Sequence, residues 1–462
     1  MSRPPVSVVM PFAGSRAEGE AAVSALAALE VRPGDELILV DNGGSLRDPL
    51  AGSLREPGGG GVVVVSAEGE QSPAHARNVG AEHAHGEWIL FLDADCRAPA
   101  DLVDRFFAEP VDADVGAIAG AVEPAPAPAS FAARYGAARS FLNQDAHLAH
   151  GYMPRAVAAN LLVRRAAFAA IGGFYEGVRA AEDTDFSWRL QRAGWRLVSC
   201  PQARVEHSYR TSVRALRRQW RGYAAGRAWL SRRYDGFAPE PALVRAAGRV
   251  VHRRRRNLAL PDRPADARAA GGSAAGSGRR TGPGRAGRDP SRVERGGFLA
   301  LDAMLGVEEL AGFALSNRPR ADSRAPARVV LVADRFPSPG DPLAEYALTL
   351  DGARVEAAAR PEAVQWEAAR RLRIDYREDD GAAQRVLALA GLMARHPLRC
   401  LRDVLMRPTP AGWSAAPGLA ALAPAVTRLQ RDTAPRVLPI GGADARAVAA
   451  RLARLAGRSL DG

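Results

Sequence analysis

The chain has 462 residues, of which 47% are hydrophobic and 25% charged, and this composition is typical of a globular protein long enough for two or three domains. Its three cysteines are far apart and odd in number, which argues against a disulfide framework and against a metal-ligand cluster. The sequence also lacks the apolar run of a signal peptide and any uninterrupted apolar stretch of about 18 residues, so we expect a cytoplasmic protein.

The net charge of +12 is carried by arginine alone, because the sequence contains no lysine. Residues 204–256 hold fifteen arginines against three acidic residues, and 15 − 3 = +12 equals the charge of the whole chain. A segment of this kind predicts contact with an anionic surface, such as the inner face of the plasma membrane. It also leaves open a nucleic-acid-binding protein, whose affinity would fall steeply with salt.

The first 120 residues alternate apolar runs with stretches of helical spacing. The runs show little polar alternation, as expected of parallel strands that are covered on both faces. We therefore predict an α/β fold with a mostly parallel, doubly wound sheet. The expected strands are residues 6–12, 35–41, 61–66 and 87–95, and the expected helices are 20–30 and 72–86.

A second block contains a short helix, a strand and a long basic helix. Residues 183–193 place Phe186 and Leu190 on one helical side, and Gly194 ends the helix. A strand follows at 195–201. Residues 210–233 form a helix with an apolar face and an opposite face of arginines, which predicts an anionic surface as partner. The apolar face consists of Val213, Leu216, Trp220, Tyr223 and Leu230.

Composition divides the chain into four parts. Residues 1–235 form the first domain, and 236–296, rich in Gly, Pro and Arg, read as a flexible linker. Residues 297–320 predict an amphipathic helix that either lies in a membrane interface or packs against protein. A strand near 327–342 and helical patterns at 382–405 and 443–456 predict a smaller accessory α/β domain over 321–462.

Two carboxylates directly follow the apolar run at 88–92. Asp93 and Asp95 are two residues apart, so on an extended segment both side chains point the same way, beyond the carboxyl end of the strand where open α/β sheets bind ligands. A hard divalent cation, Mg²⁺ or Mn²⁺, carrying phosphate oxygens as further ligands would satisfy both charges. The alternative is a surface turn.

Two further polar residues are expected at the same edge. Asp41 ends the strand at 35–41 and is able to accept hydrogen bonds from a nucleobase, or else it caps a turn. Arg77, in the helix at 72–86, is able to face a diphosphate, or else it is a solvated charge.

In this order, "VSVVMPF", "LVDNGG", "ARNVG", "LFLDAD", "AANLLVRRAAFAAIGGFYE", "AAEDTDFSWRLQRAGW" and "VEH" resemble the family 2 glycosyltransferases, which are mostly inverting enzymes with the GT-A fold. The resemblance covers roughly residues 6–230. It implies that Pro11 and Asp41 lie at the nucleotide, Arg77 at the diphosphate, and Asp93 and Asp95 at the ribose and the metal.

The resemblance also assigns the other side of the site. Asp183 matches the catalytic base, and Glu182 precedes it in an acidic pair; without the resemblance both would be acidic residues that stabilise a helix N-terminus. His207 matches a histidine that completes the metal site in some members, or else it is structural. Asn160 and Gly173 match a segment that shapes the acceptor and donor sugar pocket.

Trp188 is a further candidate for the sugar pocket, where it would stack on a sugar; core packing is the alternative. The resemblance thus implies a metal-dependent inverting glycosyltransferase. It would use a nucleotide-diphosphate sugar and a glycan or lipid-linked acceptor in cell-surface polysaccharide or glycoconjugate synthesis, without a nucleic-acid partner.

Departures from the family pattern concern the donor. Many members continue the first strand as Pro-X-Tyr-Asn and the second as Asp-Asp-Gly-Ser, whereas this chain has "PFAGS" and "DNGG", so the nucleotide and the sugar stay open. Residues 330–410 loosely resemble part of a family 4, GT-B-type glycosyltransferase. A sugar-nucleotide-forming nucleotidyltransferase is the alternative enzyme, but it would need a Gly-rich phosphate-binding loop after the first strand.

Overall fold

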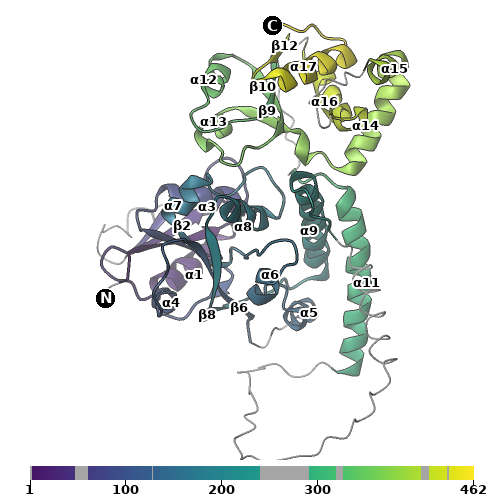
Figure 1. Cartoon of the computed structure of the whole chain (residues 1–462). Coiled ribbons are helices and arrows are strands. Elements are labelled where there is room, and N and C mark those ends of the chain that lie inside the picture. Colours follow the sequence, from purple (N-terminus) through teal and green to yellow (C-terminus); the bar gives the residue numbers. More distant parts are fainter. Residues whose placement is uncertain are drawn as a thin grey trace, which may run out of the picture.

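The computed structural model describes residues 3–46, 61–126, 128, 130–239, 291–318, 326–406, 416–433 and 436–461. Figure 1 shows two α/β parts, one built on a large sheet near the N-terminus and a smaller one near the C-terminus, with the long helix α11 beside them. None of the helices in these described ranges is long and apolar enough to cross a membrane.

The large sheet has eight strands in the order β3-β2-β1-β4-β7-β6-β8-β5. The pairs β2–β3, β1–β2, β1–β4 and β6–β8 are parallel, whereas β7 and β5 run antiparallel to their neighbours. The predicted α/β class with a mostly parallel sheet is therefore confirmed. The strands are β1 Val6–Phe12, β2 Glu36–Asp41, β3 Val62–Ser66, β4 Trp88–Leu92, β5 Cys96–Arg97, β6 Val115–Pro124, β7 Asn160–Arg164 and β8 Arg196–His207.

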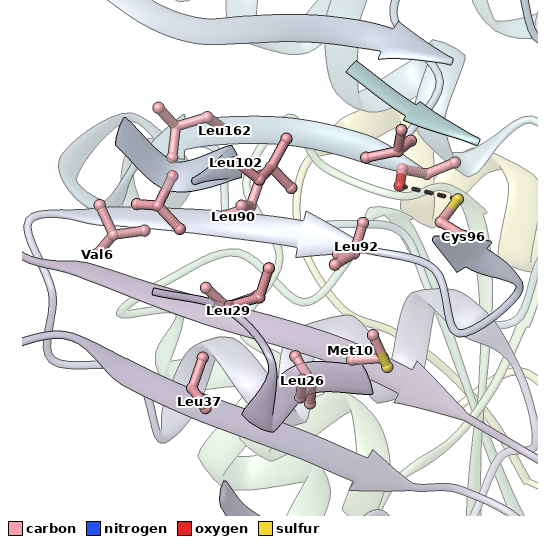
Figure 2. Close-up of a cluster of buried hydrophobic side chains, with 14 of the residues drawn as sticks. Val6, Met10, Leu26, Leu29, Leu37, Leu90, Leu92, Cys96, Leu102 and Leu162 are labelled. Atoms are coloured by element: carbon pink, nitrogen blue, oxygen red, sulfur yellow. Dashed lines mark hydrogen bonds between the residues drawn. The ribbon is translucent and has the colours of Figure 1, made fainter. Parts of the chain in front are cut away.

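Apolar side chains cover both faces of this sheet, which explains why its strands read as continuous apolar runs. On one face, shown in Figure 2, Leu26 and Leu102 belong to the same cluster of buried side chains as Leu90 and Leu162. The helices on that face are α1 Arg16–Ala27 and α4 Leu102–Arg105. The other face is covered by α3 Pro73–Glu82, α7 Arg165–Ala170 and α8 Glu182–Arg192.

The long basic helix is α9, Val213–Arg233, and it packs against α11, Arg292–Ala314, along most of its length. Its apolar side chain Leu216 is buried with Phe298 and Leu305 of α11 and with residues of α5, Phe131–Arg139. The apolar face of α9 is therefore covered by protein. Contact of the arginines of α9 with an anionic surface stays a prediction.

Helix α11 also differs from its predicted bounds of 297–320. It begins earlier because Ser291 caps it, accepting a hydrogen bond from the Glu294 amide at 3.1 Å. Of the predicted linker 236–296, residues 240–290 lie outside the described residues, and 292–296 are helical. The predicted domain boundaries stay a prediction.

The smaller sheet has four parallel strands in the order β11-β10-β9-β12, which confirms the predicted α/β C-terminal region. Its strands are β9 Val329–Arg335, β10 Ala353–Ala359, β11 Arg373–Tyr376 and β12 Arg436–Pro439. Its helices are α12 Pro342–Thr349, α13 Trp366–Arg371, α14 Ala382–Arg395, α15 Pro397–Leu405, α16 Leu419–Arg431 and α17 Ala443–Ala456. The predicted helix 382–405 is thus two helices, since Pro397 lacks the N–H that a continuous helix needs.

Candidate active site

The candidate site lies where β4 ends at the carboxyl edge of the large sheet. The chain turns directly after Leu92, and the Cys96 amide donates to the Asp93 carbonyl at 2.9 Å. The short strand β5 then pairs with the end of β8, which sets Cys96 opposite His207. This turn is how a buried apolar strand comes to present two carboxylates at its end.

Asp93 and Asp95 have different partners in this turn. Asp93 Oδ1 accepts a 2.7 Å hydrogen bond from Arg77 Nη2, whereas Asp95 Oδ1 lies 3.2 Å from His207 Nε2. Burial opposes ionisation of Asp95, but the His207 hydrogen bond and charge, with Arg210, outweigh it and lower the pKa of Asp95. The lowered pKa therefore favours the ionised form of Asp95 at the sheet edge.

The predicted three-residue metal site of Asp93, Asp95 and His207 is not assembled in this way. Within the part of the chain that the structure describes, no group of three or more His, Cys, Asp or Glu side chains is close enough to hold a metal ion. The physical reason is Arg77, which holds the Asp93 carboxylate in an ion pair. What the structure does bring together is a pair of donors, Asp95 and His207.

Arg77 is placed by a close contact between α3 and the sheet. A Cβ at Gly80 would lie 2.3 Å from Val9 Cγ1 and 2.8 Å from Val40 Cγ2, so only glycine lets the helix approach this closely. Arg77 is 4% exposed, and besides Asp93 it reaches Glu182, with 3.3 Å between Nη1 and Oε1. It thus joins the β4 side of the site to α8 and is no solvated charge.

The first turn of α8 carries Glu182 and Asp183. Burial, with the neighbouring charge of Asp183, raises the pKa of Glu182 to about 7. Asp183 Oδ1 accepts hydrogen bonds from the Thr184 amide at 2.6 Å and hydroxyl at 3.3 Å, and its other oxygen, Oδ2, has no hydrogen-bond partner among the described residues. One carboxylate oxygen is thus fixed and the other is available.

The segment before α8 has an unusual backbone. Ala181, the N-cap residue, has φ 72°, a left-handed conformation that a residue with a Cβ rarely adopts. It is held there by α9, because Gly226 lies so close that a Cβ would come within 2.8 Å of the Ala180 carbonyl oxygen. Such strain persists where the surrounding structure imposes it, and it often accompanies a functional site.

One residue at the acidic pair was missed as a site residue. Tyr223 of α9 accepts a 2.9 Å hydrogen bond from Gln219, and burial, with the charges of Asp183 and Glu182, raises its pKa above the usual value. Its spacing had placed it on the apolar face of the helix, so the sequence carried no signal for this position.

Asp41 lies in a turn and not at a nucleobase. It is 2% exposed, and its carboxylate accepts hydrogen bonds from the amides of Gly43, Gly44 and Leu46 at 2.8–3.0 Å. With its oxygens occupied, the residue shapes the loop after β2, which corrects the prediction of a nucleotide contact. Pro11, on β1, is half-buried and pairs with Val40 at this same edge.

The three candidates for the sugar pocket are all built into the interior. Trp188 is 0% exposed and donates from Nε1 to the Met153 carbonyl at 3.2 Å, which corrects a sugar-stacking role to core packing. Asn160 is also 0% exposed, and its amide bridges the carbonyls of Ala121 and Ala203. Gly173 has φ 72°, and its carbonyl accepts from Arg189 at 2.7 Å.

Comparison with known proteins finds similarity to glycosyltransferases. Residues 88–256 match the model of "Glycosyl transferase family group 2". The pre-mycofactocin glycosyltransferases of two Mycobacterium tuberculosis strains are each 28% identical over 216 residues, which cover 45% of this chain and 44% of theirs. The chain thus spans less than half the length of these curated relatives.

Two solved structures are similar to a lower degree. A mannosyltransferase from Pyrobaculum calidifontis, in complex with GDP-Man and Mn²⁺, is 21% identical, with 56% of this chain and 77% of that chain covered and a TM-score of 0.40. Glucosyl-3-phosphoglycerate synthase from Mycobacterium tuberculosis is 19% identical, with 48% and 78% covered and a TM-score of 0.33.

The fold is an α/β domain with acidic side chains at the carboxyl edge of its large sheet. Residues 88–256 are thus similar to a family 2 glycosyltransferase domain, which confirms the resemblance carried by the motifs in this range.

Proposed function

We propose that the chain is a metal-dependent inverting glycosyltransferase that moves a sugar from a nucleotide-diphosphate donor to a glycan or lipid-linked acceptor. One observation carries the proposal: at the carboxyl edge of the sheet, buried Arg77 joins Asp93 to Glu182, which stands beside Asp183. This arrangement sets an acidic pair on α8 across from the β4 carboxylates. Inversion needs this kind of opposition between a base and the leaving nucleotide.

Asp183 is the proposed base. Its free Oδ2 is able to take the proton of the acceptor hydroxyl as that oxygen attacks the anomeric carbon, while the hydrogen bonds from Thr184 to Oδ1 fix the orientation of the carboxylate. Glu182 is tied to Arg77 and so maintains the connection to the donor side. The role of Arg77 in this scheme is to position the two acidic elements and to place positive charge near the departing diphosphate.

Asp95 and His207 are the residues that would hold the divalent cation. The carboxylate of Asp95 suits Mn²⁺ or Mg²⁺, and the imidazole nitrogen of His207, 3.2 Å away, is a second donor for Mn²⁺. Mg²⁺ is commonly bound by one or two carboxylates together with substrate phosphates. When bound, the ion would neutralise charge that grows on the leaving diphosphate. Asp93 is close to this pair but is engaged by Arg77.

A donor panel tests the proposal. Purified protein with Mn²⁺ or Mg²⁺ is incubated with UDP-, GDP- and dTDP-sugars, and binding and slow donor hydrolysis are measured. Asp183→Asn should abolish transfer and keep donor binding, whereas Glu182→Gln should retain part of the activity. No binding and no hydrolysis with any donor would refute the function, and an active Asp183→Asn would remove the residue as base.

We further propose that the acceptor is presented at the inner face of the plasma membrane, and the support comes from α15. Leu398, Leu401 and Leu405 are 79%, 55% and 75% exposed, and Arg399 and Arg402 are exposed among them. Exposed apolar side chains flanked by arginine fit an anionic lipid surface. Flotation with phosphatidylglycerol vesicles should weaken with Leu398→Ser and Leu405→Ser together. The control is Leu299→Ser on α11, at 67% exposure, and equal flotation of both variants contradicts the idea.

A further inference from the structure

A cavity of about 580 Å³ lies between the end of α9 and the smaller sheet. In that sheet the chain runs from the inner strand β9 to β10 and β11 on one side and returns to β12 on the other, so the strand order reverses at β9. Open parallel sheets bind ligands outside the carboxyl ends of their strands at such a reversal. The cavity opens there, since Asp334 and Arg335 at the end of β9 and Ala359 at the end of β10 line it.

Three of its lining arginines have no carboxylate partner among the described residues. Arg232, Arg377 and Arg385 donate only to the backbone carbonyls of Glu378, Glu356 and Arg377 respectively, at 2.9–3.2 Å. Arg232 Nη2 and Arg385 Nε are buried without any hydrogen-bond partner in the described structure. Buried donors of this kind are costly unless something accepts from them.

The charge on these arginines is poorly compensated. Burial lowers the pKa of Arg377 and of Arg385, and burial with the adjacent Arg385 charge lowers the pKa of Arg232 to about 10. Two other arginines at this interface behave in the opposite way: Arg233 and Arg360 are buried too, but the carboxylates beside them raise their pKa. The cavity therefore holds positive charge that an anionic ligand would complete.

The cavity also has acidic groups, which are able to accept hydrogen bonds from the hydroxyl groups of a ligand. Asp334 ends β9, and Asp444 lies in the first turn of α17. A carboxylate beyond a strand end accepts hydrogen bonds from ribose hydroxyls in nucleotide-binding sheets. Two ion pairs complete the charged lining: Arg233 with Glu378 at 3.0 Å, and Arg335 with Glu362, which are 3.4 Å apart and more than half exposed.

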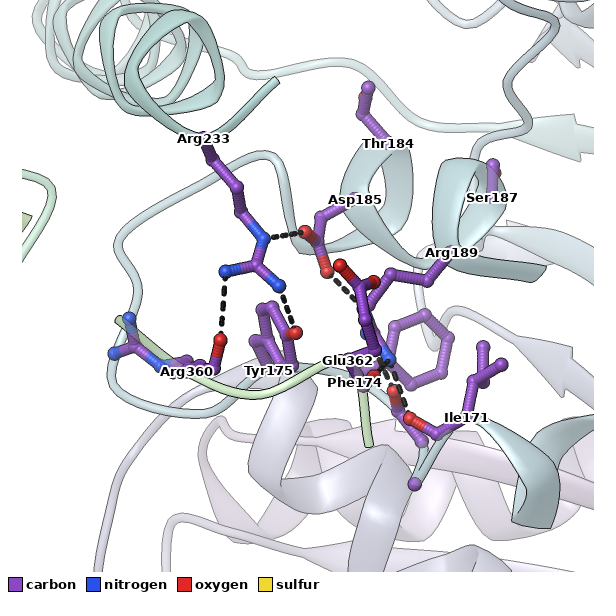
Figure 3. A network of polar contacts seen from close by, with 12 residues as sticks. Ile171, Phe174, Tyr175, Thr184, Asp185, Ser187, Arg189, Arg233, Arg360 and Glu362 are labelled. Carbon is purple, nitrogen blue, oxygen red and sulfur yellow. Dashed lines mark hydrogen bonds and ion pairs between the residues drawn. The ribbon is translucent and has the colours of Figure 1, made fainter. Parts of the chain in front are cut away.

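We propose that this interdomain cavity binds a phosphorylated sugar, free or as part of a nucleotide, with its phosphate at Arg232, Arg377 and Arg385 and its hydroxyls at Asp334 and Asp444. The site is separate from the donor site at the edge of the large sheet. It is adjacent to α8, the helix that carries the proposed base, because Arg233 next to Arg232 bonds Asp185 of α8 at 3.1 Å (Figure 3). A ligand here would hold α9 and the smaller sheet together beside α8.

The test uses the full chain carrying Asp95→Asn, which weakens the donor site. Calorimetry at physiological salt measures the binding of glucose 1-phosphate, UDP and inorganic phosphate. Tighter binding of glucose 1-phosphate than of UDP indicates a free sugar phosphate as the ligand, and tighter binding of UDP indicates a nucleotide-borne one. We expect saturable binding of one ligand per chain. Arg385→Gln should reduce the affinity about ten- to a hundredfold, as the loss of a charged hydrogen bond does.

Matched variants decide between the site and a general effect of charge. Arg395→Gln removes an exposed arginine from the same helix, α14, and should leave binding unchanged. Asp334→Asn should lower the affinity for glucose 1-phosphate and leave the affinity for inorganic phosphate unchanged. Arg232→Gln repeats the test from α9 in case Arg385→Gln fails to fold. The proposal is overturned if no saturable binding occurs, or if folded Arg385→Gln and Arg232→Gln chains bind like their Arg395→Gln control.

Discussion

Replacement of Arg233 by methionine tests how strongly the two α/β parts are joined. Arg233 is 4% exposed and bonds Asp185 of α8 at 3.1 Å and Glu378 of the smaller sheet's region at 3.0 Å. It also donates to the Arg360 carbonyl at 3.2 Å and to the Tyr175 hydroxyl (Figure 3). The substitution keeps an apolar stem and removes the guanidinium, so it leaves two buried carboxylates each without one partner.

The magnitude follows from the burial of these partners. Asp185 is 0% and Glu378 6% exposed, and removal of one member of a buried ion pair costs about 3–5 kcal/mol. Asp185 retains Arg189, and Glu378 retains Arg360. We therefore expect the lower end, about 3 kcal/mol of unfolding free energy.

Arg196→Met is the matched control. Arg196 also bonds two carboxylates, Asp112 and Asp114, each at 3.0 Å, but it is 51% exposed and its partners are 72% and 55% exposed. Exposed pairs contribute about 0–1 kcal/mol. The comparison therefore separates burial from the number of charges.

Urea unfolding, followed by tryptophan fluorescence, measures both variants. A free energy of unfolding for Arg233→Met within about 1 kcal/mol of that for Arg196→Met would refute the reasoning, because it would mean that the buried carboxylates do not depend on Arg233. A double-mutant cycle with Glu378→Gln adds a second check. It should give a coupling of about 0.5–3 kcal/mol across the two parts.

Three further outcomes are expected. Gly312→Ala on α11 should destabilise the chain by about 1–3 kcal/mol, since its Cβ would lie 2.5 Å from the Arg221 carbonyl oxygen. Gly296→Ala on the same helix adds a Cβ with no atom within 4 Å and should stabilise the chain by up to about 1 kcal/mol. Thermal unfolding compares the two variants. With a metal chelator present, the unfolding free energy of the wild type should fall by about 3 kcal/mol relative to that of Glu182→Gln as pH rises from 4.5 to about 7. The reason is that the raised pKa of Glu182 in the folded chain contributes stability that is complete below pH 4.5 and is lost as pH rises through the folded pKa. Equal pH dependence of the two unfolding free energies contradicts this. The factor by which Mn²⁺ raises the affinity for UDP should be at least about tenfold smaller in His207→Ala than in the wild type, as measured by calorimetry. An equal factor in both proteins would show that His207 is not a metal ligand.

The sheet could be predicted from the sequence because its strands are buried on both faces and therefore read as continuous apolar runs. The turn role of Asp41 was also readable, since an Asp followed by Gly43 and Gly44 is typical of a turn in which the carboxylate accepts backbone amides. The family resemblance outweighed that local signal. Similarly, Pro397 marked a helix boundary inside a continuous helical pattern.

The partners of Arg77 could not be predicted in the same way. Its two carboxylates are 16 and 105 residues away in the sequence, and only the folded chain brings them to one guanidinium. Trp188 shows the same limit in reverse. Its position beside the acidic pair suggested a ligand contact, but aromatic packing with Tyr234 and Phe237, more than forty residues later, encloses it.

The acidic helix α8 is held from two directions, and this has a consequence for the C-terminal region. Arg77 bonds Glu182 from the sheet side, and Arg233, which also bonds Glu378, reaches Asp185 from the other side. Because these contacts fall within the first turn of α8, the orientation of Asp183 depends on both parts of the chain. We therefore expect the proposed active site to need the C-terminal region that carries Glu378, and a ligand in the cavity beside Arg232 would act on the same helix end.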